Sequence, residues 1–304
     1  MSSTASTEKK QRIELIDPRQ AYPRPPFANQ KAIELPGLTQ EMSPVPDHGE
    51  ESYQGSGRLT GLNALITGGD SGIGRAVAIC YAREGANVAI NFISESKDAE
   101  QTAELAEQAG VKASVLQGDL REEPNCTALI QQTLQELGGL DILVNNAAYQ
   151  QTRDSVEEFS NELFDRIFKT NVYAPFWLSR AAMKHLPPGG SIINTVSIQG
   201  YNPSPYLLPY AASKSALMGM TKGLAKLAME HGIRVNAVAP GPVWTPLIPS
   251  TMPVDKFRNF GGDTIFERPA QPIELAPLYV WLASPAASYV TAEVFGCTGG
   301  KTPL

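Results

Sequence analysis

The chain has 304 residues, of which 42% are hydrophobic, so it can bury the core of one large α/β domain. Its formal charge is −6, from 25 basic and 31 acidic residues, so the sequence lacks the basic footprint that nucleic acids or anionic membrane surfaces require. We therefore expect a small-molecule partner, and neither nucleic acid nor a membrane.

The cysteines and the N-terminal stretch indicate the compartment. Cys80, Cys126 and Cys297 lie far apart with no CxxC spacing, which excludes a disulfide framework and a zinc site of that type. The first residues carry lysines without a following apolar run, and no stretch of 18 apolar residues occurs. These features predict a cytoplasmic protein with buried free thiols and no metal.

Prolines set the first part of the chain apart from the rest. Residues 1–58 contain seven prolines among polar residues and show no sustained helical or strand period. We expect an irregular, proline-rich N-terminal extension here, followed by one domain over residues 59–304. The pattern leaves open whether the extension binds along another subunit or forms a disordered arm.

From residue 62 onward, short apolar runs alternate with amphipathic stretches. The amphipathic stretches place apolar residues at helical spacing, and several end in glycine, as at Gly85 and Gly138. This alternation predicts a doubly wound parallel sheet with helices on both faces, the Rossmann fold. Its expected strands, the last one less clear, are residues 62–67, 87–92, 112–117, 140–145, 191–196, 234–239 and 293–298.

A glycine-rich turn follows the first expected strand. The stretch "TGGDSGIGRA", residues 67–76, has Gly68, Gly72 and Gly74 at the opening of a helix. Glycine lets a pyrophosphate approach the backbone N–H groups, and the helix N-terminus favours negative charge. A glycine turn alone is weak, since it also makes tight strand-to-helix connections, but its place after the first strand favours a nucleotide site.

Three further stretches lie at the expected carboxyl ends of strands, where doubly wound folds bind ligands. They are "GDL" at 118–120, "NNAA" at 145–148 and "PGPVWT" at 240–245. Taken singly, Asp119 is more often a helix N-cap, and Asn146 is more often a turn former. Their joint placement is what indicates one ligand crevice.

These motifs, with Ser197 and "YAASK" at 210–214, resemble the classical short-chain dehydrogenase/reductase family over about residues 60–300. The resemblance implies NAD or NADP as cofactor and a homotetramer. It assigns the pyrophosphate to the glycine turn, the adenine to the loop after the third strand, the nicotinamide ribose to "NNAA" and the carboxamide to Thr245. The implied cofactor residues are Gly68, Asp70, Ser71, Gly72, Ile73, Gly74, Phe92, Asp119, Leu120, Asn146, Ala147, Ala148, Tyr210, Lys214, Pro240, Gly241, Val243 and Thr245.

Two positions depart from the usual family pattern. Ala148 stands where the family usually has glycine, which predicts a small packing change beside the cofactor. Phe92 stands at the end of the second strand, where an acidic residue would bind the ribose 2′-hydroxyl of NAD. Asp70 and Ser71 occupy positions that are often basic in NADP-preferring relatives, and Lys97 is the only nearby cation. The choice between NAD and NADP therefore stays open.

The expected catalytic group is Asn171, Ser197, Tyr210 and Lys214. Tyr210 and Lys214 lie four residues apart, so on a helix both side chains share one face. The group suits hydride transfer at a carbonyl carbon, with Ser197 donating a hydrogen bond to the substrate oxygen and Tyr210 moving its proton. We expect the Lys214 cation and the nicotinamide ring to favour the ionised phenol. In the family, the residue that matches Asn171 holds a water linked to the lysine.

Residues 244–268 are expected to form a lid with several aromatic side chains beside the site. The candidate substrate contacts are Gln199, Tyr201, Tyr206 and Trp244. An apolar pocket suits a small aldehyde or alcohol. Together with the expected catalytic group, it predicts an oxidoreductase that acts on such a substrate. Three alternatives remain: a glucose-type sugar dehydrogenase, a 3-oxoacyl reductase, or a dinucleotide sensor without turnover. An epimerase or dehydratase is disfavoured because no long C-terminal substrate domain follows.

Overall fold

The structure, a computed structural model, describes residues 15–301, so the first 14 residues of the expected extension and the last three of the expected domain lie outside it. It contains a sheet of seven parallel strands in the order β3-β2-β1-β4-β5-β6-β7. The predicted Rossmann fold is confirmed, including its seventh strand. The strands are β1 (Asn63–Thr67), β2 (Asn87–Phe92), β3 (Ala113–Gln117), β4 (Ile142–Asn145), β5 (Ser191–Thr195), β6 (Arg234–Pro240) and β7 (Val294–Cys297).

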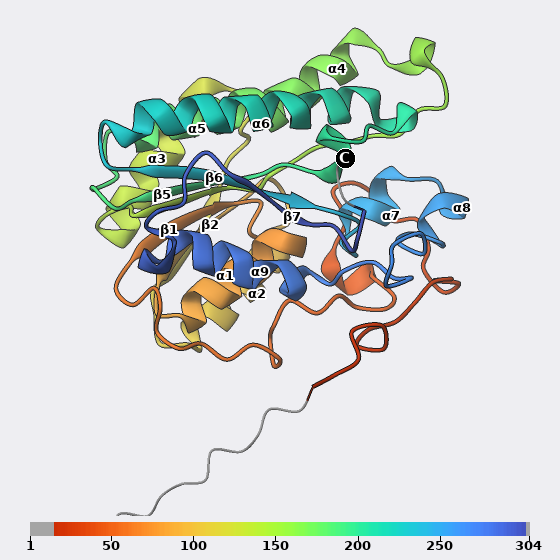
Figure 1. Ribbon diagram of the computed structural model, residues 1–304, viewed down its shortest axis with the longest axis horizontal. Coiled ribbons are helices and arrows are strands. Elements are labelled where there is room, and N and C mark those ends of the chain that lie inside the picture. The colour runs from red at the N-terminus through yellow and green to blue at the C-terminus, as the bar shows by residue number, and fades with distance from the viewer. Residues whose placement is uncertain (1–14, 302–304) are drawn as a thin grey trace, which may run out of the picture.

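Helices cover both faces of this sheet (Figure 1). One face carries α1 (Gly72–Arg83), α2 (Ser96–Glu107) and α9 (Pro272–Ala283). The other carries α3 (Glu123–Leu137), α4 (Asn161–Phe168), α5 (Ala174–Ala182) and the long α6 (Leu208–Met229). The short α7 (Leu247–Thr251) and α8 (Val254–Phe257) lie in the connection from β6 to β7.

Burial explains why the apolar runs become strands. Every residue of β4, β5 and β6 is buried, as expected for parallel strands covered on both faces. Glycine ends the helices as predicted: Gly138 adopts the left-handed conformation (φ 80°) after α3, and its N–H donates to the carbonyl of Leu134 at 2.9 Å. Two hydrophobic clusters, one on each face, hold the layers together.

The strand order reverses at β1, whose neighbours are β2 on one side and β4 on the other. Ala64 of β1 pairs with Val88 of β2 and with Ile142 of β4. At such a switch point the loops leave the sheet in opposite directions and open a crevice at the carboxyl ends of the strands. This crevice is where the predicted site residues should meet.

Residues 15–58, which we call the strap, contain no strand or α-helix, only the short 3-10 turn η1 (Thr39–Glu41). The strap runs along the outside of the domain: it passes α8 and α7 first and then α9 on its way to β1 (Figure 1). It packs on its own chain: the rings of Phe27 and Trp244 lie 4.2 Å apart between centroids, and the Asp47 N–H donates to Gln271. The described part is therefore an irregular segment held against its own domain. The sequence analysis had considered only a segment bound along another subunit or a disordered arm.

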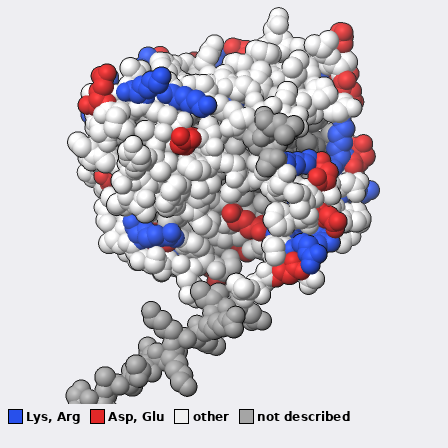
Figure 2. All heavy atoms as spheres, viewed as in Figure 1, with Lys and Arg blue, Asp and Glu red and all other residues white. Residues whose placement is uncertain are grey.

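The structure also bears on the predictions about cysteines, membrane-spanning helices and surface charge. Cys80 and Cys126 are buried free thiols, whereas Cys297 is partly exposed. Within residues 15–301, no helix is both long and apolar enough to cross a membrane. On the face shown in Figure 2, basic and acidic side chains are interspersed, so no large area of one sign occurs there.

Candidate active site

A cavity of about 740 Å³ lies at the carboxyl ends of the strands. The loops that follow β1, β2, β3, β4, β5 and β6 all contribute to its walls, and so does the strap, through Leu35 and Pro36. Convergence of these loops is what the topology predicts at a switch point. Most of the predicted cofactor residues line this one cavity: Gly68, Asp70, Ser71, Gly72, Ile73, Phe92, Asp119, Leu120, Asn146, Ala147, Ala148, Tyr210, Lys214, Pro240, Gly241, Val243 and Thr245.

The glycine turn after β1 has a geometry that side chains would block. Gly68 and Gly72 have φ of +59° and +52°, a region that favours glycine. A Cβ on Gly74 would lie 1.9 Å from the carbonyl oxygen of Gly68, so only glycine lets α1 start this close to the strand. Gly74 therefore shapes the turn from behind. The open backbone and the N-terminus of α1 fit the pyrophosphate of a dinucleotide.

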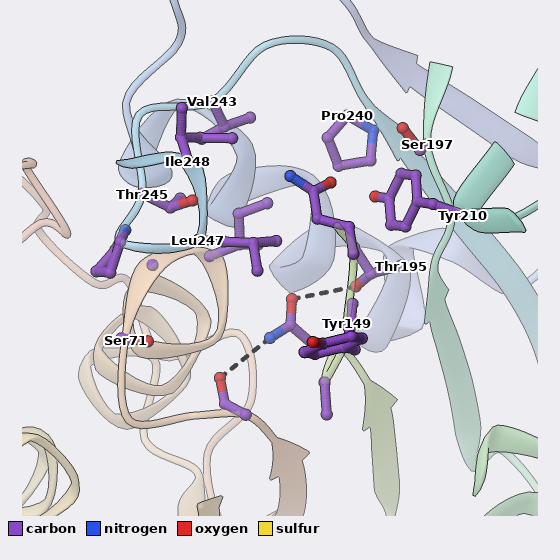
Figure 3. A pocket seen from close by; sticks show the side chains of 18 of the residues that line it. Ser71, Tyr149, Thr195, Ser197, Tyr210, Pro240, Val243, Thr245, Leu247 and Ile248 are labelled. Atoms are coloured by element: carbon purple, nitrogen blue, oxygen red, sulfur yellow. Dashed lines mark hydrogen bonds between the residues drawn. The ribbon is translucent and has the colours of Figure 1, made fainter. Parts of the chain in front are cut away.

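Asn146 ties three strands together beneath the cavity. Its side-chain Nδ2 donates to the carbonyl oxygens of Thr67 and Gly68, both at 3.1 Å, and its Oδ1 accepts from the Thr195 hydroxyl at 3.3 Å. These contacts join the ends of β1, β4 and β5. The network fixes the floor of the cavity before any ligand enters (Figure 3).

Ser197, Tyr210 and Lys214 come together on one wall. Ser197 follows β5, whereas Tyr210 and Lys214 lie on consecutive turns of α6 and are both buried. In Figure 3 the hydroxyl groups of Ser197 and Tyr210 lie close together and face the pocket, across from Ser71 and Thr245. The Lys214 Nζ donates to the carbonyl of Thr195 at 2.6 Å and lies 5.5 Å from the centre of the Tyr210 ring. The predicted shared face is thus observed.

Burial shifts the pKa of both titratable groups on this wall. Burial raises the pKa of Tyr210 to about 12, although its hydrogen bond with Ser197 acts in the opposite direction. Burial also lowers the pKa of Lys214 to about 7. Both shifts favour the uncharged form, because removal from water penalises a charge before a partner stabilises it. Burial of this wall thus favours the protonated phenol of Tyr210.

Asn171 lies in a π-helical turn, the π-turn (Lys169–Tyr173), which joins α4 to α5. Its Nδ2 donates to the Tyr149 carbonyl and to the Ser213 hydroxyl, both at 3.0 Å, and its Oδ1 accepts from the Tyr149 N–H. Such π-turns are frequent at functional sites. Asn171 is fully buried behind the cavity and fixes the segment after β4 against α6.

The opposite end of the cavity carries two carboxylates. Asp70 and Glu95 line it there, together with Ser71. Burial raises the pKa of Asp70 to about 6, and the nearby Glu95 and Asp98 add to the shift. The Lys97 ammonium, the only cation that the sequence offered nearby, donates to the side chain of Gln40 at 3.3 Å.

Three of the four candidate substrate residues lie elsewhere. Gln199 lines the cavity, but Trp244 is fully buried against Phe27 and donates its indole N–H to the Pro44 carbonyl at 2.8 Å. The expectation that Trp244 meets substrate is therefore wrong, because the strap binds it from the other side. Tyr201 and Tyr206 are each 42% exposed and lie outside the lining of the cavity.

Several residues that line the cavity were not among the predicted site residues. Leu35 and Pro36 come from the strap, whose period is irregular. Tyr149 directly follows "NNAA", so its position was a usable signal; its ring stacks under the Arg166 guanidinium at 4.0 Å. From the expected lid, Met252 and Phe260 do reach the cavity, while Phe257 is buried beside Trp244.

The chain is similar in sequence and in structure to known oxidoreductases. The family model described as Enoyl-(Acyl carrier protein) reductase matches residues 68–302. The chain is 42% identical to NADPH-dependent aldehyde reductase 1, chloroplastic, from Arabidopsis thaliana, over 89% of this chain and 96% of that protein. It is equally 42% identical to glucose and ribitol dehydrogenase from Daucus carota, over 90% and 96%. A solved short-chain dehydrogenase from Burkholderia cenocepacia, in complex with NADP, has a TM-score of 0.74 at 31% identity, over 80% and 99%.

Proposed function

The chain belongs to the short-chain dehydrogenase/reductase family, and from this premise we propose that it transfers a hydride between NAD(P)H and a small aldehyde, or back from the corresponding alcohol. Its membership makes it an NAD(P)-dependent oxidoreductase, and either dinucleotide fits the cofactor site. The aldehyde is our proposal. It is supported by an apolar rim from the lid, including Leu247, Met252 and Phe260.

One observation carries the proposed chemistry: the hydroxyl groups of Ser197 and Tyr210 face the same side of the cavity (Figure 3). A dinucleotide bound there supplies or accepts the hydride. In reduction, Ser197 donates a hydrogen bond to the carbonyl oxygen, and Tyr210 transfers its phenolic proton to that oxygen as the hydride reaches the carbon. Lys214 is fixed by the Thr195 carbonyl beside Tyr210, and its pKa is about 7, so its protonated form stabilises the phenolate that remains when the proton leaves.

The residues proposed to hold the dinucleotide follow the loops. The turn of Gly68, Gly72 and Ile73 would bind the pyrophosphate, with Gly74 allowing the helix to approach. Asp119 and Leu120 would contact the adenine, Asn146 and Ala147 the nicotinamide ribose, and Thr245 the carboxamide. Asn171 acts through its contacts with Tyr149 and Ser213, as a positioning residue.

The proposal is tested by replacing Tyr210 with Phe. We expect kcat/KM to fall about 10²-fold or more, as for loss of a general acid, while the dissociation constant of the dinucleotide is unchanged. Tyr206→Phe is the matched control, because this exposed tyrosine lies four residues away and outside the cavity lining. Retained turnover in Tyr210→Phe, or equal losses in both variants, would show the assignment to be wrong.

The substrate is tested by following the absorbance of the reduced nicotinamide with NADH and NADPH separately. Aldehydes, ketones, sugars and 3-oxoacyl thioesters form the panel. The sugar alternative is favoured by Gln199, Asn202 and Asn259 on the cavity wall, whose amides suit a polyol. Faster turnover of sugars than of aldehydes would replace the aldehyde proposal, and tight dinucleotide binding without any turnover would favour a sensor.

We further propose a cytoplasmic homotetramer whose catalytic domain is residues 59–304 and whose residues 1–58 are an extension. Its free cysteines suit a reducing compartment. Aromatic side chains on α4, the π-turn and α5 support self-association: Phe164, Tyr173 and Phe176 are 43%, 45% and 42% exposed. Light scattering after size-exclusion chromatography measures the assembly directly, and a monomer would refute it.

A further inference from the structure

The strap crosses the cleft between two of its walls. On one side, the Ile33 N–H donates to the Pro249 carbonyl of α7 at 3.3 Å. On the other, the Thr39 N–H donates to Asp98 near the start of α2 at 2.8 Å. Because α7 follows β6 and α2 follows β2, the span from Ile33 to Thr39 joins elements from opposite halves of the sheet.

Leu35 and Pro36 lie in the middle of this span and line the cavity. The adjacent Gly37 is packed against the lid, since a Cβ there would lie 3.2 Å from Pro246. Pro246 directly follows Thr245, the residue proposed to hold the carboxamide. The strap is thus in contact with the lid on one side and reaches α2 on the other.

One anchor of the span, Thr39, lies at the adenosine end of the proposed dinucleotide. In doubly wound folds the residues at the end of the second strand meet the adenosine ribose. Here those residues are Phe92, Ile93 and Glu95, which line the cavity just before α2, and Thr39 is bonded to α2. Leu35 and Pro36 lie between Ile33, which is bonded to α7, and Thr39, which is bonded to α2, so they line the cavity between the lid and the strand end where the adenosine would lie.

The strap is held there by contacts with buried side chains of the domain. The Pro44 carbonyl accepts from the Trp244 indole, and the Phe27 ring packs on the same indole. Farther along, the buried Glu84 carboxylate accepts hydrogen bonds from Ser56 and Arg58. A segment fixed at several points behaves as a wall of the cavity.

We propose that the strap forms a roof over the adenosine half of the dinucleotide and that Leu35 and Pro36 raise cofactor affinity by apolar contact. This inference rests on the proposed dinucleotide site. It assigns the extension a role in binding, and it predicts that the strap matters for the dinucleotide but not for the proton transfer at Tyr210.

The test uses the full chain and compares Leu35→Ala with Val45→Ala. Both are partly exposed apolar residues of the strap, at 37% and 65% exposure, but only Leu35 lines the cavity. We expect the dissociation constant of NADH and NADPH, followed by nicotinamide fluorescence, to rise about three- to tenfold in Leu35→Ala, as for loss of a few buried methylene contacts. Val45→Ala should bind as the unaltered chain does.

Cofactor fragments separate a local roof from a general disturbance. ADP-ribose contains the adenosine half, whereas nicotinamide mononucleotide does not. By titration calorimetry, Leu35→Ala should weaken ADP-ribose by the same factor and leave nicotinamide mononucleotide unchanged. If Leu35→Ala and the unaltered chain bound ADP-ribose equally well, or if Leu35→Ala weakened both fragments equally, the proposed role of the strap would be wrong. The proposed hydride transfer would be unaffected. If the unaltered chain bound neither NADH nor NADPH, the proposed function would fail with it.

Discussion

The two ends of the cleft are built from different kinds of contact. The tyrosine end, defined by Ser197, Tyr210 and Lys214, comes from one strand and the helix that follows it. The strap end, defined by Leu35 and Pro36, is held by long-range hydrogen bonds. The bond from Thr39 to Asp98 spans 59 positions in the sequence, and the bond from Trp244 to Pro44 spans 200. The difference teaches that one cavity can combine a wall set by local periodicity with a wall that depends on long-range anchors.

Burial affects the ionisation of titratable groups differently at the tyrosine end and along the strap. At the tyrosine end, burial shifts the pKa of both titratable groups toward the neutral form, because neither has a charged partner there. Along the strap, the buried Glu84 remains ionised. Burial alone would raise its pKa, but hydrogen bonds from Arg58 and Tyr53 outweigh this and hold the pKa at about 2. Three predictions separate the two ends.

The largest effect is expected from pH at the tyrosine end. Because the pKa of Tyr210 is raised to about 12, the phenol is protonated between about pH 6 and 9. Alcohol oxidation requires its ionised form, so kcat/KM for oxidation should rise about tenfold per pH unit, while kcat/KM for reduction stays nearly flat. Initial rates in both directions measure this. The reverse pattern, flat oxidation with falling reduction, would show that Tyr210 is already ionised.

A change of slope near pH 7 would come from Lys214, whose pKa burial lowers to about 7. Lys214→Arg distinguishes it, because arginine stays charged over the whole range. The change of slope should disappear in that variant, and its persistence would assign it to another group.

The second effect concerns the strap anchor. Glu84→Gln should lower the free energy of unfolding by about 1–3 kcal/mol, because it removes the charge that accepts hydrogen bonds from Tyr53 and Arg58. The folded pKa lies below the ordinary value of 4.5, so this stabilisation is complete above about pH 4.5 and is lost as pH falls toward 2. Thermal melts at several pH values should show the difference in Tm closing on acidification.

Glu107→Gln is the control for this variant, since Glu107 is exposed near the end of α2. It should leave Tm nearly unchanged at every pH. A difference between Glu84→Gln and the unaltered chain that stays constant down to about pH 3 would contradict the role of the ionised carboxylate.

The smallest effect concerns the contact between strap and lid. Trp244→Phe keeps an aromatic ring against Phe27 but removes the indole hydrogen bond to the Pro44 carbonyl, which should cost about 1–2 kcal/mol of unfolding free energy. Denaturant unfolding measures it. Trp177→Phe on α5 is a matched control, which should cost less because no hydrogen bond of its indole N–H is found within residues 15–301. Equal costs would show that the Pro44 contact adds nothing.

The sheet and most of the site were predictable because their signals are local and periodic. Apolar runs of strand length predicted β1 to β6, and parallel strands necessarily bring their carboxyl ends to one edge. That rule placed Gly68, Asp119 and Asn146 around one cavity. The spacing of four residues likewise placed Tyr210 and Lys214 on one face of α6.

The sequence by itself therefore determined the Rossmann fold and which loops meet at the crevice. Only the tertiary structure decided what covers it. Trp244 could have faced either the substrate or the core, and the strap contact placed it in the core. The strap has no periodic pattern, so its path over the cleft follows from hydrogen bonds and apolar contacts with residues far away in sequence. Those contacts exist only after the domain has folded.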